Sequence, residues 1–356
     1  MTTYFYTASG ATGDVDAYRL DPGGDSGTVS LERTASVNAG EKLGALAIGF
    51  GNSRLYVADR TEPAIVTFGV APTGALTRLG AVPTLSPLVN LCLSADSKNV
   101  YGVSYVDGTV CVHPLNPDGS VRPAETAPLH LGGDAHCHDV VEVAPDEVIV
   151  SSLGHDVLYR VRRDPSSGTL GQAPSSVRDE RGSGPRHLRL SPARDVLYVL
   201  GERTARITAH ALTSGRAPRS WHTVPPRIAL APGIVRTPGS SAPASDPASG
   251  LPYTWAADLA LSPEGRLLFS SERSSSTVSV TAAATGELLA WTHVERQPRG
   301  IGLDPTGRFL LVTGELSETV SLYAVAEDGR LRHVASAPAR PGVLWAESAS
   351  LDRMAG

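Results

Sequence analysis

The chain has 356 residues and a formal net charge of −5, with 19% charged and 5% aromatic residues. This acidic balance offers no basic footprint for nucleic acid or an anionic membrane surface, and we expect neither as a partner. No stretch approaches the roughly 18 consecutive apolar residues that a membrane-spanning helix requires. The 36 glycines and 27 prolines suit many short strands joined by tight turns.

A short β-type segment recurs seven times along the chain, and each copy is followed by a second apolar segment. The copies are YFYTAS, RLYVADR, NVYGVSY, EVIVSSL, VLYVLGE, LLFSSER and FLLVTGE, aligned on the anchors Tyr6, Tyr56, Tyr101, Ile149, Tyr198, Phe269 and Leu311. Neighbouring anchors are 42 to 50 residues apart, except for one interval of 71. A period of about 40–50 residues with several strands per unit is typical of a β-propeller blade.

Each repeat predicts the same unit of four strands. An apolar strand such as LVNLCLSA or RHLRLSP precedes a tight turn, the anchor strand and the second segment, while GALTRLGAV and GRLRHVASA predict a polar fourth strand. The C-terminal PGVLWAESA has no anchor strand after it, and the N-terminus lacks a first strand. We therefore predict an all-β, seven-bladed β-propeller of four-stranded antiparallel blades, closed by joining the N- and C-terminal segments in one blade.

Residues 1–356 then form a single domain, and the interval of 71 residues marks an insertion at residues 215–252. The insertion is rich in Pro, Ser, Ala and Gly and shows no strand alternation. A long segment of this kind inside a compact domain is either functional or disordered. With Trp221, Tyr253 and Trp255 at its ends, it is either a lid over a site or a mobile excursion.

Polar residues recur at two places that antiparallel strands bring to the same rim of a propeller. The loops before the first strands contain His136, His138, Asp139, Arg186, His187 and Arg299. The position four residues beyond each anchor holds Gly10, Arg60, Tyr105, Leu153, Glu202, Arg273 and Glu315. Arginine forks and imidazoles at one end of the central channel suit an anionic, oxygen-rich ligand, and His or Glu can move protons near neutral pH.

Several of these residues also have a purely structural interpretation. Arg60 and Glu315 can be solvated charges at the rim, and Arg186 and Arg299 can donate to neighbouring carbonyls. Strand alternation would place His136 on the same face as His138, and we favour a functional role for at least one of them.

The string AHCHD also raises the question of a metal site. Cys137 would point away from both histidines in a strand, and no other Cys or His cluster has ligand spacing. We therefore predict neither a metal nor a cofactor. Cys92, Cys111 and Cys137 are odd in number and scattered, and MTTYFYTASG has no signal-peptide pattern, so we predict a reduced, cytoplasmic protein.

At these positions the chain resembles the lactonase family of seven-bladed propellers, which includes bacterial propeller-type 6-phosphogluconolactonases and the fungal carboxy-cis,cis-muconate lactonising enzyme. The matching strings are GGDAHCHDV, SLGHDVLYRV, GSGPRHLRLSP, VLYVLGE, WAADLALSPEGRLLFSSER and QPRGIGLDPTGRFLLV, and the resemblance covers about residues 40–325. It implies that His138, Arg186, Glu202 and Arg273 are catalytic. The arginines would bind the substrate's anionic group and polarise the lactone carbonyl, and either His138 or Glu202 would activate water.

Around these four, we take His136, Arg299, Tyr105, Arg60 and Glu315 as candidate substrate-binding residues. The chain departs from the family pattern at five positions, Ser104, Ser152, Gly201, Gly314 and Arg60. The family often carries Asn at the first, third and fourth of these positions, Asp at Ser152 and Glu at Arg60. These departures favour a divergent substrate.

We predict a metal-independent lactone hydrolase, 6-phosphogluconolactonase-like, acting on a small anionic lactone, in a monomer or weak dimer. One alternative is a cyclase that closes a ring on a polyfunctional acid. The other is a non-catalytic platform for protein binding, which would need apolar or aromatic patches on the rim.

Overall fold

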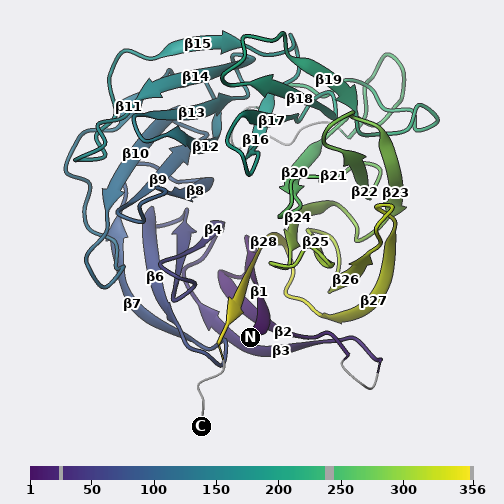
Figure 1. The fold of residues 1–356 in the computed structure, drawn as a ribbon, viewed down its shortest axis with the longest axis horizontal. Coiled ribbons are helices and arrows are strands. Elements are labelled where there is room, and N and C mark those ends of the chain that lie inside the picture. The colour runs from purple at the N-terminus through teal and green to yellow at the C-terminus, as the bar shows by residue number, and fades with distance from the viewer. Residues whose placement is uncertain (24–26, 237–243, 353–356) are drawn as a thin grey trace.

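The computed structural model describes residues 1–23, 27–236 and 244–352. In this part of the chain, strands β1 to β28 form seven four-stranded antiparallel sheets arranged around one axis (Figure 1). The predicted seven-bladed β-propeller is therefore confirmed. No helix among the described residues is long and apolar enough to cross a membrane.

We number the blades I to VII and give their strands from the axis outward. Blade I contains β28 (Val343–Leu351), β1 (Thr2–Ser9), β2 (Asp14–Asp21) and β3 (Ser30–Asn38). Blade II contains β4 (Leu43–Gly49), β5 (Arg54–Asp59), β6 (Ala64–Val70) and β7 (Leu76–Pro83). Blade III contains β8 (Asn90–Leu93), β9 (Asn99–Ser104), β10 (Thr109–Pro114) and β11 (Leu129–His130).

The remaining blades follow the same order. Blade IV contains β12 (Cys137–Ala144), β13 (Glu147–Ser152), β14 (Val157–Arg162) and β15 (Ser175–Arg178). Blade V contains β16 (Pro185–Leu190), β17 (Val196–Gly201), β18 (Arg206–Ala211) and β19 (Arg219–His222). Blade VI contains β20 (Ala256–Leu261), β21 (Leu267–Glu272), β22 (Thr277–Ala282) and β23 (Leu288–His293). Blade VII contains β24 (Pro298–Leu303), β25 (Phe309–Gly314), β26 (Thr319–Val325) and β27 (Leu331–Pro338).

The tyrosine anchors of the repeat join neighbouring blades. Tyr6 and Tyr56 are fully buried, and a buried hydroxyl needs a hydrogen-bond partner. The Tyr6 hydroxyl of blade I donates to the carbonyl of Gly74 in blade II at 3.1 Å, and the Tyr56 hydroxyl donates to Gly119 beyond β10 at 2.7 Å. The anchor position therefore supplies both apolar packing within a blade and a polar link to the next.

The two ends of the chain close the ring within blade I, as predicted. Strand β28 pairs antiparallel with β1 from Thr2 opposite Leu351 to Ser9 opposite Val343. The innermost strands β24, β28 and β4 then lie in contact along the axis, so the ring has no gap at this junction.

The insertion has more structure than its sequence pattern predicted. Residues 219–222 are β19, the outer strand of blade V, and only the rest of residues 215–252 leaves the blade. No pattern in the sequence indicates β19, because its four residues RSWH are half-buried or exposed and do not alternate. Beyond β19 the chain is tied down where Ala231 N donates to Pro252 O and Thr254 N donates to Ala231 O, both at 2.8 Å. Residues 237–243 of the insertion lie outside the described residues.

Ring closure can be tested with Ala349→Asp. Ala349 on β28 is fully buried, so a carboxylate there loses its hydration without gaining a partner. We expect the free energy of unfolding to fall by at least about 3 kcal/mol in urea denaturation. In the neighbouring control Ser350→Asp, the half-buried side chain can reach water, and we expect a loss within about 1 kcal/mol. Equal losses in the two variants would contradict burial at this seam.

Candidate active site

Equivalent strands of the blades end at the same face of the ring. The positions four residues beyond the anchors directly follow β1, β5, β9, β13, β17, β21 and β25, the second strand of each blade. Arg60, Tyr105, Glu202, Arg273 and Glu315 therefore occupy this face, as the repeat predicted. The contacts described below join the other four predicted residues, His136, His138, Arg186 and Arg299, to the same cluster.

Glu202 is the centre of the site because it pairs with two arginines. Arg186 Nε lies 2.7 Å from Glu202 Oε2, and Arg273 Nη2 lies 3.2 Å from Glu202 Oε1. All three residues are buried. Burial alone would raise the pKa of Glu202, but Arg273 and Arg186 hold it below its ordinary value. Glu202 is therefore an ionised carboxylate clamped between cations contributed by blades V and VI.

A chain of hydrogen bonds holds Arg186 from below. Its Nη1 donates to Ala257 O and to His187 Nε2, the latter at 2.7 Å, and His187 Nδ1 donates to Asp258 Oδ1 at 2.6 Å. Burial and the charge of Arg186 lower the pKa of His187 to about 4, so its ring is neutral at neutral pH. The carbonyl contact expected if Arg186 were structural is thus present alongside the pairing with Glu202.

His138 is the one catalytic candidate whose side chain has neither a hydrogen-bond nor an ion-pair partner among the described residues, and its Nδ1 is buried. Its ring centroid lies 5.2 Å from that of His187 and 6.3 Å from that of Tyr105. Burial and the neighbouring Arg186 lower the pKa of His138 well below its ordinary value. At neutral pH the site therefore contains an uncharged imidazole without a hydrogen-bond partner in the described part of the chain.

His136 reaches the site by a route that strand alternation did not predict. It lies before β12 with a φ of 48°, and the register of β12 shifts between Cys137 and Asp139. Strand alternation therefore does not relate His136 to His138, and the prediction that it would place both on one face was wrong. The His136 ring stacks on Tyr105 with centroids 4.4 Å apart, and its Nδ1 lies 3.1 Å from Tyr105 O.

The remaining predicted residues form the outer part of the cluster. Arg299 Nη1 lies 2.8 Å from Glu315 Oε1, so Glu315 is not the isolated rim charge considered above. Burial and the charge of Arg299 lower the pKa of Arg60. Within the described chain Arg60 has no ion-pair partner, and its Nε is buried without a hydrogen bond.

A cavity of about 690 Å³ opens over this cluster. Its lining includes Arg273, Arg299 and Glu315 from the blades and Arg236, Ala244, Ser245 and Pro252 from the insertion. The described flanks of the insertion thus border the site, although residues 237–243 lie outside the description. The remaining part of the lining is Trp255, Ser274 and Gln297.

Sequence reasoning omitted four residues from the site: His187, Arg236, Trp255 and Asp258. For two of them the repeat does contain a signal. His187 and Asp258 each lie two residues before the strand partner of their blade's anchor, Arg189 opposite Tyr198 and Ala260 opposite Phe269. A polar residue at that position of an otherwise apolar strand therefore indicates the residues that support Arg186 through hydrogen bonds.

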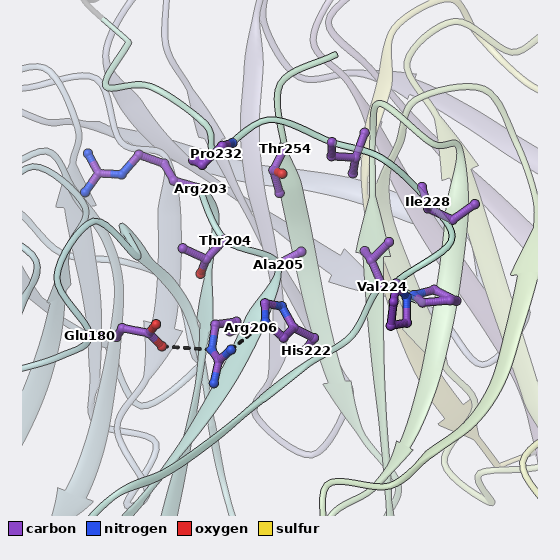
Figure 2. A pocket seen from close by; sticks show the side chains of 13 residues that line it. Glu180, Arg203, Thr204, Ala205, Arg206, His222, Val224, Ile228, Pro232 and Thr254 are labelled. Carbon is purple, nitrogen blue, oxygen red and sulfur yellow. Dashed lines mark hydrogen bonds and ion pairs between the residues drawn. The ribbon is translucent and has the colours of Figure 1, made fainter. Parts of the chain in front are cut away.

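A second cavity, of about 450 Å³, lies beside the loop that follows Glu202 (Figure 2). Its polar wall is already paired: Arg206 Nε lies 2.8 Å from Glu180, and Arg206 Nη1 lies 2.6 Å from His222 Nε2. The opposite wall is apolar, with Val224 and Ile228 from the insertion. None of the nine predicted site residues lines this cavity. The described residues contain no group of three or more His, Cys, Asp or Glu side chains placed to hold a metal ion.

The fold and site define a propeller with a buried cluster of histidine, arginine and glutamate at one end. The family model described as "Lactonase, 7-bladed beta-propeller" matches residues 2–347. The chain therefore belongs to this family of lactone-hydrolysing enzymes. A 6-phosphogluconolactonase of Sodalis glossinidius is 25% identical over 97% of this chain and 98% of its own length. One from Yersinia pestis is 23% identical over 97% of each chain.

Solved structures share the whole fold. The Pseudomonas aeruginosa periplasmic gluconolactonase superposes with a TM-score of 0.78 at 20% identity, covering 99% of this chain and 100% of that one. A Lactobacillus plantarum protein gives a TM-score of 0.79 at 21% identity, covering 98% and 100%. The predicted resemblance to the lactonase family is therefore confirmed.

The neutral state of His187 predicts a pH-dependent contribution to stability. An unfolded histidine takes up a proton near pH 6.5, whereas folded His187 does so only near pH 4. Between these values the unfolded chain binds more protons, so the contribution is present above pH 6.5 and is lost as the pH falls towards 4. We expect the stability difference between wild type and His187→Asn to shrink by up to about 3 kcal/mol from pH 7 to pH 4, measured by urea denaturation. A constant difference would show that His187 does not titrate in this way.

Proposed function

We propose that this chain hydrolyses a small anionic sugar lactone at the cavity above Glu202. The observation that carries the proposal is the pairing of two buried arginines on one carboxylate, next to a neutral histidine without a hydrogen-bond partner. Such a site combines fixed positive charge, which stabilises a developing oxyanion, with a proton acceptor for water. The curated relatives, named 6-phosphogluconolactonases and aligned over nearly their whole length, support a phosphorylated sugar lactone as the first substrate to test.

In the proposed reaction a water oxygen attacks the lactone carbonyl carbon while His138 takes one of the water's protons. Negative charge then develops on the carbonyl oxygen, where the guanidinium groups of Arg186 and Arg273 stabilise it. The ring C–O bond breaks as the intermediate collapses, and the leaving oxygen receives the proton from His138. One water is consumed, and the product is an open-chain hydroxy acid.

The geometry favours His138 over Glu202 as the base. Both carboxylate oxygens of Glu202 are engaged by arginines, and these cations lower its proton affinity. Glu202 instead positions Arg186 and Arg273, and it offsets part of their mutual repulsion in a buried setting. His138 has no competing partner among the described residues.

The cellular location and assembly state belong to the same proposal. Cys92, Cys111 and Cys137 are free in the structure, which supports a reducing compartment such as the cytoplasm. We propose that the chain is a monomer or a weak dimer. Neither the location nor the assembly state enters the reaction described above.

The catalytic roles can be tested with Arg273→Ala and His138→Ala on a panel of lactones that includes 6-phosphogluconolactone, with acid release followed by pH-stat. We expect kcat/KM to fall about 10²–10³-fold for Arg273→Ala. For His138→Ala we expect a loss of about 10²–10⁴-fold. The exposed residues Arg19 and His333 provide matched controls, Arg19→Ala and His333→Ala, which should retain wild-type rates. Absence of turnover by wild type on every lactone, or full activity of both site variants, would overturn the hydrolase proposal.

The low pKa of His138 also predicts the pH dependence of the reaction. A base must be unprotonated, and His138 stays neutral well below pH 6.5 because of burial and the charge of Arg186. We therefore expect kcat/KM, corrected for spontaneous hydrolysis, to hold constant as the pH falls from 7.5 to 6.5 and to decline only below that. An acidic limb centred above pH 6.5 would exclude His138, in this environment, as the base.

A further inference from the structure

Arg236 is a cation that the insertion places at the mouth of the cavity. Its guanidinium carbon lies 4.8 Å from the ring centroid of Trp255, and the guanidinium carbon of Arg273 lies 5.9 Å from the same ring. The two charges therefore share one indole and cannot be farther apart than the sum of these distances. Unlike Arg273, which pairs with Glu202, Arg236 has no carboxylate partner in the described part of the chain.

The backbone around Arg236 is tied to two different blades. The Tyr105 hydroxyl, from the loop after β9 in blade III, donates to Arg236 O at 2.9 Å. On the other side, Gly233 N donates to Arg203 O, in the loop that follows β17 of blade V, at 2.8 Å. The segment thus spans the mouth of the site between the two blades, and Arg236 is held in a defined place rather than on a free loop end.

Positive charge exceeds negative charge in the cluster around the cavity. The cluster, defined as Arg60, Arg186, Glu202, Arg236, Arg273, Arg299 and Glu315, contains five guanidinium groups and two carboxylates. The two carboxylates are occupied by Arg186, Arg273 and Arg299. Like charges held together in a partly buried site repel one another, and an anionic ligand relieves that repulsion. A monoanion bound by Arg186 and Arg273 would still leave the positive charges of Arg60 and Arg236 unmatched.

From these observations we propose that Arg236 is a specificity-determining residue that binds a second anionic group of the substrate, remote from the lactone carbonyl. This inference rests on the proposed lactone hydrolysis and names its substrate class, a sugar lactone that carries a phosphate monoester or a carboxylate. Arg186 does not line the cavity and lies fully buried, whereas Arg236 is half-buried at the mouth. Of the two arginines paired with Glu202, Arg273 lines the cavity and would face the reacting carbonyl, whereas Arg236 would face the far end of the bound molecule.

The chemistry of arginine suits this task. Its planar fork binds phosphate or carboxylate oxygens through two parallel hydrogen bonds, and Trp255 orients the plane by stacking. Because Arg236 does not touch the reacting atoms, its contribution to binding is the same in the ground state and in the transition state. It therefore affects KM and not kcat.

The test compares wild type with Arg236→Gln on three substrates: 6-phosphogluconolactone, a sugar lactone carrying a carboxylate, and uncharged gluconolactone. We expect Arg236→Gln to raise KM about tenfold or more for the favoured anionic lactone, with kcat preserved and gluconolactone kinetics unchanged. The anionic lactone that wild type favours identifies the second group as phosphate or carboxylate. Arg236→Lys should recover part of the affinity, because it keeps the charge but not the fork.

Arg227→Gln is the matched control, since Arg227 is also in the insertion and also stacks on a tryptophan, Trp291 at 5.1 Å, but does not line the cavity. This variant should keep the wild-type preference for the anionic lactone. If wild type turns over lactones but Arg236→Gln leaves the ratio of kcat/KM values unchanged, the inference on Arg236 is overturned and the hydrolase proposal stands.

If wild type turns over none of the three lactones, the hydrolase proposal fails instead. Calorimetric binding of 6-phosphogluconate, a sugar diacid and gluconate then decides the role of Arg236 separately. A preference for the phosphorylated acid or the diacid that Arg236→Gln abolishes supports the anion subsite. The subsite is overturned if wild type prefers neither 6-phosphogluconate nor a sugar diacid over gluconate, or if Arg236→Gln retains the preference.

Discussion

The arrangement of the site depends on the carboxylate of Asp258, which joins three blades. One oxygen accepts hydrogen bonds from His187 of blade V and from Leu259 N within blade VI, and the other accepts from Ile301 N of blade VII at 2.9 Å. A buried carboxylate with this many donors stays ionised and fixes the distances between its partners. Because His187 in turn accepts from Arg186, the packing of three inner strands sets the position of the guanidinium that pairs with Glu202.

A related contact occurs two blades away in the ring. Asp139 of blade IV accepts a hydrogen bond from Leu188 N of blade V at 2.8 Å, as Asp258 does from the blade that follows it. The repeat thus uses one carboxylate position to connect neighbouring inner strands, and the layer above that position holds His138, Arg186 and Arg299. In blades IV and V, a residue that connects neighbouring inner strands, Asp139 or His187, thus directly follows a candidate site residue, His138 or Arg186.

Much of the fold could be predicted because the repeat is periodic. Seven buried anchors at nearly constant spacing determine the blade count, and the position after each anchor strand locates Glu202, Arg273 and Glu315 on one face. The position of His136 could not be predicted from strand alternation, because His136 has a left-handed backbone conformation and the register of β12 shifts just after it. Arg236 could not have been found from the repeat, because the insertion has no equivalent in other blades and only tertiary contacts bring it to Trp255 and Tyr105.

The short outer strand β19 was missed for a different reason. Its four residues carry no alternation, and it exists because β18 offers an edge to pair with, from Arg206 opposite His222 to Ala209 opposite Arg219. Secondary structure of this kind is set by a neighbour and not by its own sequence. The pairing of β19 with β18 also determines where the chain leaves blade V for the rest of the insertion.

Ring closure by β28 couples the seam of the propeller to the site. Trp345, on that strand, places its ring 5.5 Å from the ring of His187, so the strand that closes blade I also packs against the support of Arg186. None of the arginines of the cluster lies on β28 itself. Opening of the seam would therefore leave every charge of the cluster in the chain and remove part of the packing that holds Arg186 in place.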